Sequence, residues 1–266
     1  MSADESAPEN ELGPLGRFAF NAVFWPYLAL SSVVLFFPAL GLFLATAAFD
    51  KKRRILGRFT AEWGAHYIER APYARVNVSG REHVDPNRTV IYVSNHQSLA
   101  DTLAVFSVRA PALWVSKIEV FYAPFLGWNM SLNRFIPLKR GHLPSIMRMY
   151  RTCLRRIAEG HSLLVFPEGT RSRDGNLRPF FRGAFALAAR TRVPIVPIVL
   201  EGTGDLLKKN TVGISPTTVD LVVLPAIDPA VVDYDSRKLR DHVRDVMAEE
   251  LERLRERRAR ATISAQ

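Results

Sequence analysis

The sequence predicts an α/β fold, with a mixed, largely parallel sheet flanked by helices and an apolar, membrane-associated helical segment near the N-terminus. Apolar strand patterns alternate with helical patterns over residues 75–224, as in domains built on parallel sheets. The 32 residues from Phe18 to Phe49 carry no charged side chain. The chain has 266 residues and is 48% hydrophobic, which is enough for a large buried core.

The first 50 residues divide into two segments. Residues 1–16 hold acidic residues and no lysine or arginine, which predicts a flexible acidic tail. Residues 17–50 are expected to be helical and membrane-associated, but Pro26, Pro38 and Gly41 disfavour a straight helix. One tilted or kinked span, a broken hairpin that re-enters one leaflet, and a buried helix pair of a soluble protein all stay open. The basic cluster at residues 51–54 predicts that the rest of the chain lies on the cytoplasmic side of the cell (inner) membrane.

Residues 51–233 are expected to form the α/β domain, followed by a C-terminal basic amphipathic helix and tail at 234–266. The predicted strands are Arg75–Ser79, Val90–Ser94, Leu113–Ser116, Arg134–Arg140, Ser162–Phe166, Ile195–Leu200 and Val219–Leu224. The predicted helices between them are Phe59–Ile68, Thr102–Val108, Ser145–Glu159 and Gly183–Arg190. One apolar stripe runs along the C-terminal helix, through Leu239, Val243, Met247, Leu251 and Leu254.

Charge and cysteine content limit the classes of partner. The formal net charge of +10 predicts attraction to nucleic acid, an acidic protein or an anionic membrane surface. Beside the long apolar segment, an anionic membrane lipid explains the charge better than nucleic acid does. Cys153 is the only cysteine, so no internal disulfide can form, and we expect this residue to be structural.

A histidine and a carboxylate lie five residues apart where the strand Val90–Ser94 gives way to a helix. Ser98 as N-cap and Asp101 three residues later form a capping-box pattern, which leaves His96 on the loop before the helix. The Asp101 carboxylate can accept from one imidazole nitrogen while the other faces a substrate. This arrangement is a serine-protease triad without its serine, so it predicts acyl transfer to a hydroxyl that the substrate supplies. The alternative is that both residues only organise the loop and cap the helix.

A second polar segment, residues 166–172, follows the strand Ser162–Phe166. Gly169 lets the backbone approach a ligand, and Arg171 offers a planar fork suited to phosphate oxygens. Glu168 is expected to orient Arg171 or to accept from a substrate hydroxyl. Arg140, at the end of another strand, is a further candidate for phosphate binding. An ordinary turn with exposed charges is the alternative for this segment.

Taken together, these segments resemble the glycerolipid acyltransferase family, which includes the bacterial 1-acylglycerol-3-phosphate acyltransferases. The family block Asn-His-x-Ser-x-x-Asp is matched by Asn95, His96, Ser98 and Asp101. The block Phe-Pro-Glu-Gly-Thr-Arg-Ser is matched without exception by residues 166–172. Residues 136–140 and 193–197 match two weaker blocks, and Arg134 and Lys139 depart from the family pattern in the first of these.

The resemblance implies a membrane-bound enzyme that moves an acyl chain from acyl-CoA or acyl carrier protein to the sn-2 hydroxyl of 1-acylglycerol-3-phosphate, giving phosphatidic acid for phospholipid biosynthesis. His96 and Asp101 would be catalytic, and Asn95, Ser98 and Pro194 would support the motifs. Acceptor binding would fall to Glu168, Gly169, Thr170, Arg171 and Arg140. The resemblance implies no cofactor, and the sequence gives His96 no metal-ligand cluster.

Three other functions compete with this prediction. The acceptor could be another lyso-lipid or an amino-acid-derived lipid. A lipid hydrolase would use water in place of the alcohol, but the chain has no Gly-x-Ser-x-Gly elbow. A non-catalytic membrane-binding module would keep the fold without the chemistry.

Overall fold

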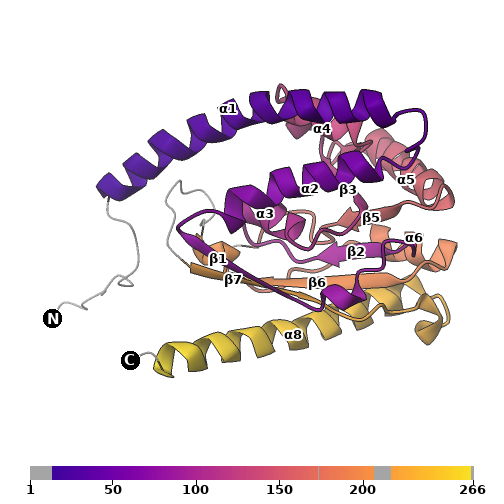
Figure 1. The fold of residues 1–266 in the computed structure, drawn as a ribbon. Helices are drawn as coiled ribbons and strands as arrows, with labels where there is room; N and C mark the ends of the chain where they lie inside the picture. The colour runs from indigo at the N-terminus through magenta and orange to yellow at the C-terminus, as the bar shows by residue number, and fades with distance from the viewer. Residues whose placement is uncertain (1–13, 173, 207–216, 265–266) are drawn as a thin grey trace.

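Seven strands form one sheet in the computed structural model, which describes residues 14–172, 174–206 and 217–264 (Figure 1). The strands are β1 (Ala74–Ser79), β2 (Ile91–Ser94), β3 (Ala112–Lys117), β4 (Ile136–Leu138), β5 (Ser162–Val165), β6 (Ile195–Glu201) and β7 (Thr217–Val223). Their order across the sheet is β1-β7-β6-β2-β5-β3-β4. Every pairing is parallel except that of β6 with β7, which is antiparallel. The predicted mixed, largely parallel sheet is confirmed.

Helices cover both faces of this sheet. They are α1 (Pro14–Thr46), α2 (Arg54–Glu69), α3 (Ala100–Phe106), α4 (Leu126–Leu132), α5 (Leu143–Ala158), α6 (Gly183–Thr191), α7 (Thr203–Leu206) and α8 (Ser236–Ser264). Three short 3-10 helices, η1 (Arg81–His83), η2 (Ile118–Tyr122) and η3 (Pro229–Val232), lie in the connections. The sequence patterns did not predict α4, α7 or the 3-10 helices, all of which are seven residues or shorter.

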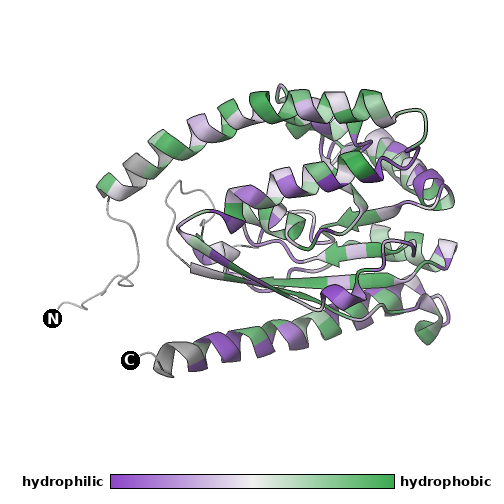
Figure 2. Cartoon of the chain, in the orientation of Figure 1, coloured by the Kyte–Doolittle hydropathy of each residue, from purple (hydrophilic) through white to green (hydrophobic). Residues whose placement is uncertain are grey.

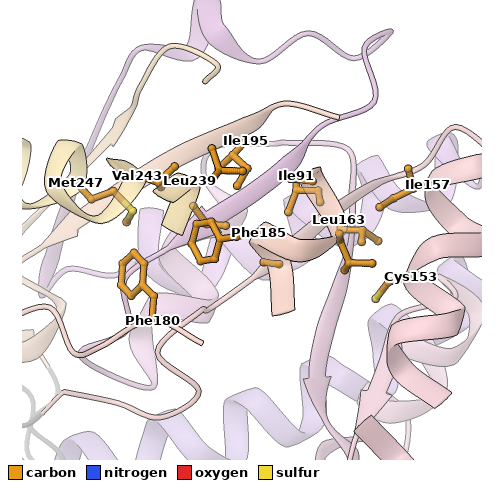
Figure 3. Close-up of a cluster of buried hydrophobic side chains, with 14 of the residues drawn as sticks. Ile91, Cys153, Ile157, Leu163, Phe180, Phe185, Ile195, Leu239, Val243 and Met247 are labelled. Carbon is orange, nitrogen blue, oxygen red and sulfur yellow. The ribbon is translucent and has the colours of Figure 1, made fainter. Parts of the chain in front are cut away.

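Each face of the sheet has its own hydrophobic core. One core joins the strands to α2, α3 and α7 through Ile68, Ala104 and Leu206. The other joins them to α5, α6 and α8, and Figure 3 shows Phe185 and Ile195 packed with side chains from α8. Burial on both faces explains why β2 is a continuous apolar run rather than an alternating one.

The C-terminal helix belongs to the α/β domain. The predicted stripe of α8 is buried, since Leu239, Val243 and Met247 are fully covered and share one core with Ile91 of β2. The boundary expected at residue 234 therefore separates no independent unit. Cys153 of α5 lies in the same core, and burial raises the pKa of its thiol to about 12, in line with the expected structural role.

The apolar segment forms one continuous helix, α1, rather than a broken hairpin. Pro26 and Pro38 both lie inside α1, so of the arrangements left open the hairpin broken at these residues is excluded, and a single tilted or kinked helix remains. The helix passes over α2 and α4 and is mostly apolar in Figure 2, with Phe36 and Ala39 buried against its neighbours. α1 as a whole forms a helical hairpin with the following helix, α2. Of the expected acidic tail, residues 1–13 lie outside the described residues and residues 14–16 belong to α1.

The outer face of α1 is apolar and exposed. Leu30, Val34 and Phe37 are each more than half exposed. The stretch Ala22–Thr46 has a mean hydropathy of 2.3 and is long and apolar enough to cross a membrane, with only 17% of it buried in the protein. Such low burial argues against the buried helix pair of a soluble protein.

Gly64 of α2 provides a test of this packing. A Cβ at Gly64 would lie 2.1 Å from the ring of Phe106, which is stacked on Trp114 at 4.4 Å between centroids. We expect Gly64→Ala to lower the free energy of unfolding by about 1–3 kcal/mol, because the overpacking outweighs the gain in helix propensity. Denaturant unfolding in detergent measures the change. The control Gly183→Ala has nothing within 4 Å and should be neutral or slightly stabilising; equal effects of the two variants would contradict the packing.

Candidate active site

The candidate site is built where β2 and β5 end side by side. These strands pair in parallel with Val93 opposite Val165, so both chains leave the sheet at the same edge. His96 follows β2 and Glu168 follows β5 on adjacent loops. The carboxyl edge of a parallel sheet is the usual place for a ligand, and here it brings the two sequence motifs together.

The pair His96 and Asp101 has the expected geometry. His96 Nδ1 lies 2.7 Å from Asp101 Oδ2, and the Asp101 side chain is fully buried. The same oxygen accepts from the backbone N–H groups of Gln97 at 2.6 Å and Ser98 at 2.8 Å. Ser98 Oγ accepts in turn from the Ala100 N–H at 3.2 Å. The Ser98 N–H bond to Asp101 is one of the two bonds of the predicted capping box, but Ser98 Oγ accepts from Ala100 rather than from Asp101. α3 begins at Ala100 and ends two residues before the predicted Val108.

Glu168 lies behind the histidine rather than beside Arg171 or a substrate. Its side chain is 2% exposed, and its two oxygens accept from the backbone N–H groups of His96 at 2.9 Å and Arg178 at 3.2 Å. Burial, opposed by these hydrogen bonds, raises the pKa of Glu168 to about 7. Glu168 thus helps to hold the His96 backbone in place, and its expected contact with a substrate stays a prediction.

The two loops are further tied together around the imidazole. The Ser172 N–H donates to the His96 carbonyl oxygen at 2.7 Å. Phe166 stacks on the His96 ring with 4.5 Å between centroids. Gly169 has φ +66°, and a Cβ there would lie 2.5 Å from Phe181, so this position requires glycine.

The remaining phosphate candidates lie on the solvent side of these loops. Thr170 and Arg171 are half-buried, and Arg140 follows β4. The two guanidinium groups are close enough that Arg171 acts with burial to lower the pKa of Arg140, against Glu119, which raises it. Two neighbouring cations at the rim of the site can hold one doubly charged anion.

The three supporting residues have structural roles. The Asn95 amide extends β2 toward β6, since it donates to the Leu200 carbonyl at 2.9 Å and accepts from the Leu200 N–H at 2.8 Å. Ser98 caps α3 as described. Pro194 precedes β6 at the opposite edge of the sheet, where its carbonyl accepts from the Ile91 N–H.

An apolar cavity of about 300 Å³ lies on the side of the sheet that carries α1 to α4. Its walls come from α1, α2, α3, α4 and β3, and include Phe24, Tyr67, Leu103, Trp114 and Met130. Trp114 packs edge-on against Phe166 at 6.2 Å, so one aromatic ring separates the cavity wall from His96. Leu99 and Ala100, just after the motif histidine, line the same space.

Sequence reasoning missed two residues that hold this site. The Gln97 side chain reaches the Gly175 carbonyl and Glu201, and Arg255 of α8 bonds the same two partners from the other side. Gln97 lies within the motif, but nothing in the spacing of α8 predicts Arg255. In the part of the chain that the structure describes, no group of three histidine, cysteine, aspartate or glutamate side chains could hold a metal ion.

Comparisons with known proteins place this site among acyltransferases. Residues 75–201 match the family model described as Acyltransferase. A 1-acyl-sn-glycerol-3-phosphate acyltransferase of Chlamydomonas reinhardtii is 34% identical over 86% of this chain and 68% of its own length. A chloroplastic protein of the same name from Brassica napus is 40% identical over 62% of this chain and 48% of its own length, so this chain spans about half of that relative.

A solved structure shares the fold over nearly its full length. The 1-acyl-sn-glycerophosphate acyltransferase from Thermotoga maritima superposes with a TM-score of 0.73 at 26% identity, and the match covers 90% of this chain and 98% of that one.

The buried Glu168 carboxyl predicts a pH dependence of stability. Its pKa is about 7 in the folded protein and about 4.5 in the unfolded chain, so between these values the folded state holds the proton that the unfolded state has lost. This contribution to stability is complete below about pH 4.5 and is lost as pH rises to about 7, by roughly 3 kcal/mol. Denaturant unfolding of Glu168→Gln should show a flatter profile across this window. An equally steep loss in the variant would assign the pH dependence to another group.

Proposed function

Because the chain belongs to the 1-acyl-sn-glycerol-3-phosphate acyltransferase family, we propose that it transfers an acyl chain from a thioester donor to the sn-2 hydroxyl of 1-acylglycerol-3-phosphate, giving phosphatidic acid. The observation that carries the proposal is the 2.7 Å contact of His96 with buried Asp101, beside the loop that bears Arg171. The chemistry needs a base for an alcohol, and the site offers one without a protein nucleophile.

The proton path follows from the tautomer that Asp101 selects. When Nδ1 donates to the carboxylate, Nε2 keeps its lone pair for the incoming hydroxyl. The substrate oxygen attacks the thioester carbonyl as its proton moves to Nε2, and the carbon–sulfur bond then breaks. The thiolate takes the proton from the imidazolium, which Asp101 stabilises meanwhile, and neither an acyl-enzyme nor a cofactor is needed.

Acceptor binding is assigned to the rim of the site. Arg171 and Arg140 interact electrostatically, since Arg171 lowers the pKa of Arg140, and both suit the phosphate of the acceptor. Gly169 and Thr170 bring the loop backbone to the same place. When the phosphate is held, the free hydroxyl of the acceptor is fixed relative to His96. The two motifs can act together in this way because they lie on adjacent strand ends.

The apolar cavity fits the acyl chain. It is lined by aromatic and aliphatic side chains, and Leu99 and Ala100, which follow the motif histidine, are among them. Leu99, Val120 and Trp128, on the same part of the molecule, are each more than a third exposed. A lipid substrate can therefore pass from a bilayer to the cavity with little apolar surface left in water.

Membrane association is part of the proposal. We assign the exposed face of α1 to the lipid phase and the net charge of +10 to attraction for anionic lipid and for the donor, acyl-CoA or acyl carrier protein. The thioester then arrives from the cytoplasm at the inner face of the cell membrane. Neither nucleic acid nor a metal has a role in this scheme.

Replacing the base gives the first test. We expect His96→Ala to lower turnover about 10²–10⁴-fold and to keep the fold, because Asp101 Oδ2 still accepts from the backbone N–H groups of Gln97 and Ser98. Release of free thiol from acyl-CoA or acyl carrier protein, with product identified by mass spectrometry, measures the rate. The exposed His242→Ala on α8 is the control and should keep wild-type activity. Undiminished transfer by His96→Ala would remove the mechanism.

Replacing the rim cation gives the second test. Arg171→Ala should raise the KM for the phosphate-bearing acceptor about 10–100-fold, because a charge-assisted contact to phosphate is lost, while the KM for the donor stays the same. The exposed Arg190→Ala on α6 removes the same charge elsewhere and should change neither constant. A loss confined to turnover would contradict the phosphate role.

A further inference from the structure

A second cavity, which is polar, opens at the edge of the sheet opposite His96. It measures about 810 Å³ and is bounded by α2, by the chain that enters β2 and by the starts of β3 and β5. From Val90 to His96 the chain advances along β2 by about 20 Å at the rise of an extended strand. The cavity is thus distinct from the proposed reaction site, and Phe106, Trp114 and Phe135 separate it from the apolar cavity by lining both.

The lining of this cavity is strongly cationic. Basic side chains contribute from three segments, namely Lys52, Arg53, Arg54, Arg58, Arg81 and Arg88. Among the described residues that line it, Glu62 is the one acidic side chain, and it accepts from Arg109 at 2.6 and 2.9 Å. Arg109 also binds Glu69, so this local ion pair leaves the six other cations without a carboxylate from the cavity wall.

Several of the cations are held in place by neutral groups. Lys52 Nζ donates to the Gly160 carbonyl at 3.2 Å, Arg54 Nη2 to that of Pro86 at 3.1 Å, and Arg81 Nη2 to that of Ser107 at 2.9 Å. Backbone carbonyls orient these side chains but leave their charge uncompensated. A folded chain that gathers like charges in this way is arranged for an anion.

Arg53 shows the need for a partner most directly. Its Nε and Nη1 are buried and have no hydrogen-bond partner among the described residues, while its guanidinium lies over the Phe43 ring at 4.2 Å. Buried donors are normally satisfied, so these two unpartnered N–H groups call for acceptors that the described residues do not supply. Burial and neighbouring Arg134 lower the pKa of Arg53, while Asp50 raises it.

We infer that this cavity binds a phosphate group, which Arg53 grips while Arg58 and Arg88 face it from the rim. The position favours the headgroup phosphate of an anionic phospholipid as the source. Phe43 belongs to α1, so the cavity lies at the turn where the apolar helix ends and α2 begins. A lipid bound here would anchor this turn at the membrane surface, apart from the catalytic cycle.

The test compares two double variants of the full chain. Arg58→Gln with Arg88→Gln removes two exposed cavity charges, and Arg237→Gln with Lys238→Gln removes two exposed charges at the start of α8, on the other face of the sheet. Binding to phosphatidylcholine vesicles with and without phosphatidic acid is measured by co-sedimentation, without acyl donor. We expect the cavity variant to bind acidic vesicles about tenfold more weakly and the control to change less than twofold.

Further measurements identify the source and guard against misfolding. Thermal unfolding in detergent with inorganic phosphate, against chloride of equal ionic strength, reports a soluble anion. The site is supported if phosphate or acidic lipid stabilises the wild type but not the cavity variant. Whichever of the two ligands stabilises the wild type is then the source of the bound phosphate group. Arg53→Gln should abolish the same effect. Equal losses in both double variants, or no loss in the cavity variant, would overturn the inference whether or not His96 proves catalytic.

Discussion

One carboxylate oxygen organises the candidate site. Asp101 Oδ2 accepts from the His96 imidazole and from the backbone of Gln97 and Ser98, all within 2.8 Å. Burial of a carboxyl costs free energy unless it is hydrogen-bonded, and Oδ1 is buried without a partner among the described residues, so the three bonds to Oδ2 hold the loop around Asp101. The turn that results points the histidine away from α3 and lets its backbone N–H reach Glu168. Base, tautomer and loop conformation are thus set by a single side chain.

The parallel pairing of β2 with β5 makes this arrangement possible, because it places two loops from distant parts of the sequence at one edge. Each loop then contributes what the other lacks. The first carries the imidazole and its carboxylate, and the second carries Arg171 and the glycine backbone. The helices α1 to α4 add an apolar cavity on one side, so polar and apolar parts of an amphipathic molecule meet different walls.

Much of this was predictable from local pattern. The strand ends, the capping box at Ser98 and the α/β class follow from hydrophobic periodicity and from turn chemistry, which act over a few residues. The failures share a cause in tertiary packing. Helix α1 continues through Pro26 and Pro38 because packing on α2 and α4 supports it. Glu168 faces the His96 backbone, and Arg255 reaches the loop from α8, through contacts that no spacing in the sequence encodes.

The bond from the Ser172 N–H to the His96 carbonyl is made by main-chain atoms alone. Variation of the side chain at either position leaves it intact, with proline at 172 as the exception, since that residue has no hydrogen to donate. Most substitutions at positions 96 and 172 therefore leave the relative position of the two motifs unchanged. Side chains at the rim of the site can therefore change to bind other headgroups, while the distance between His96 and the loop that bears Arg171 stays the same.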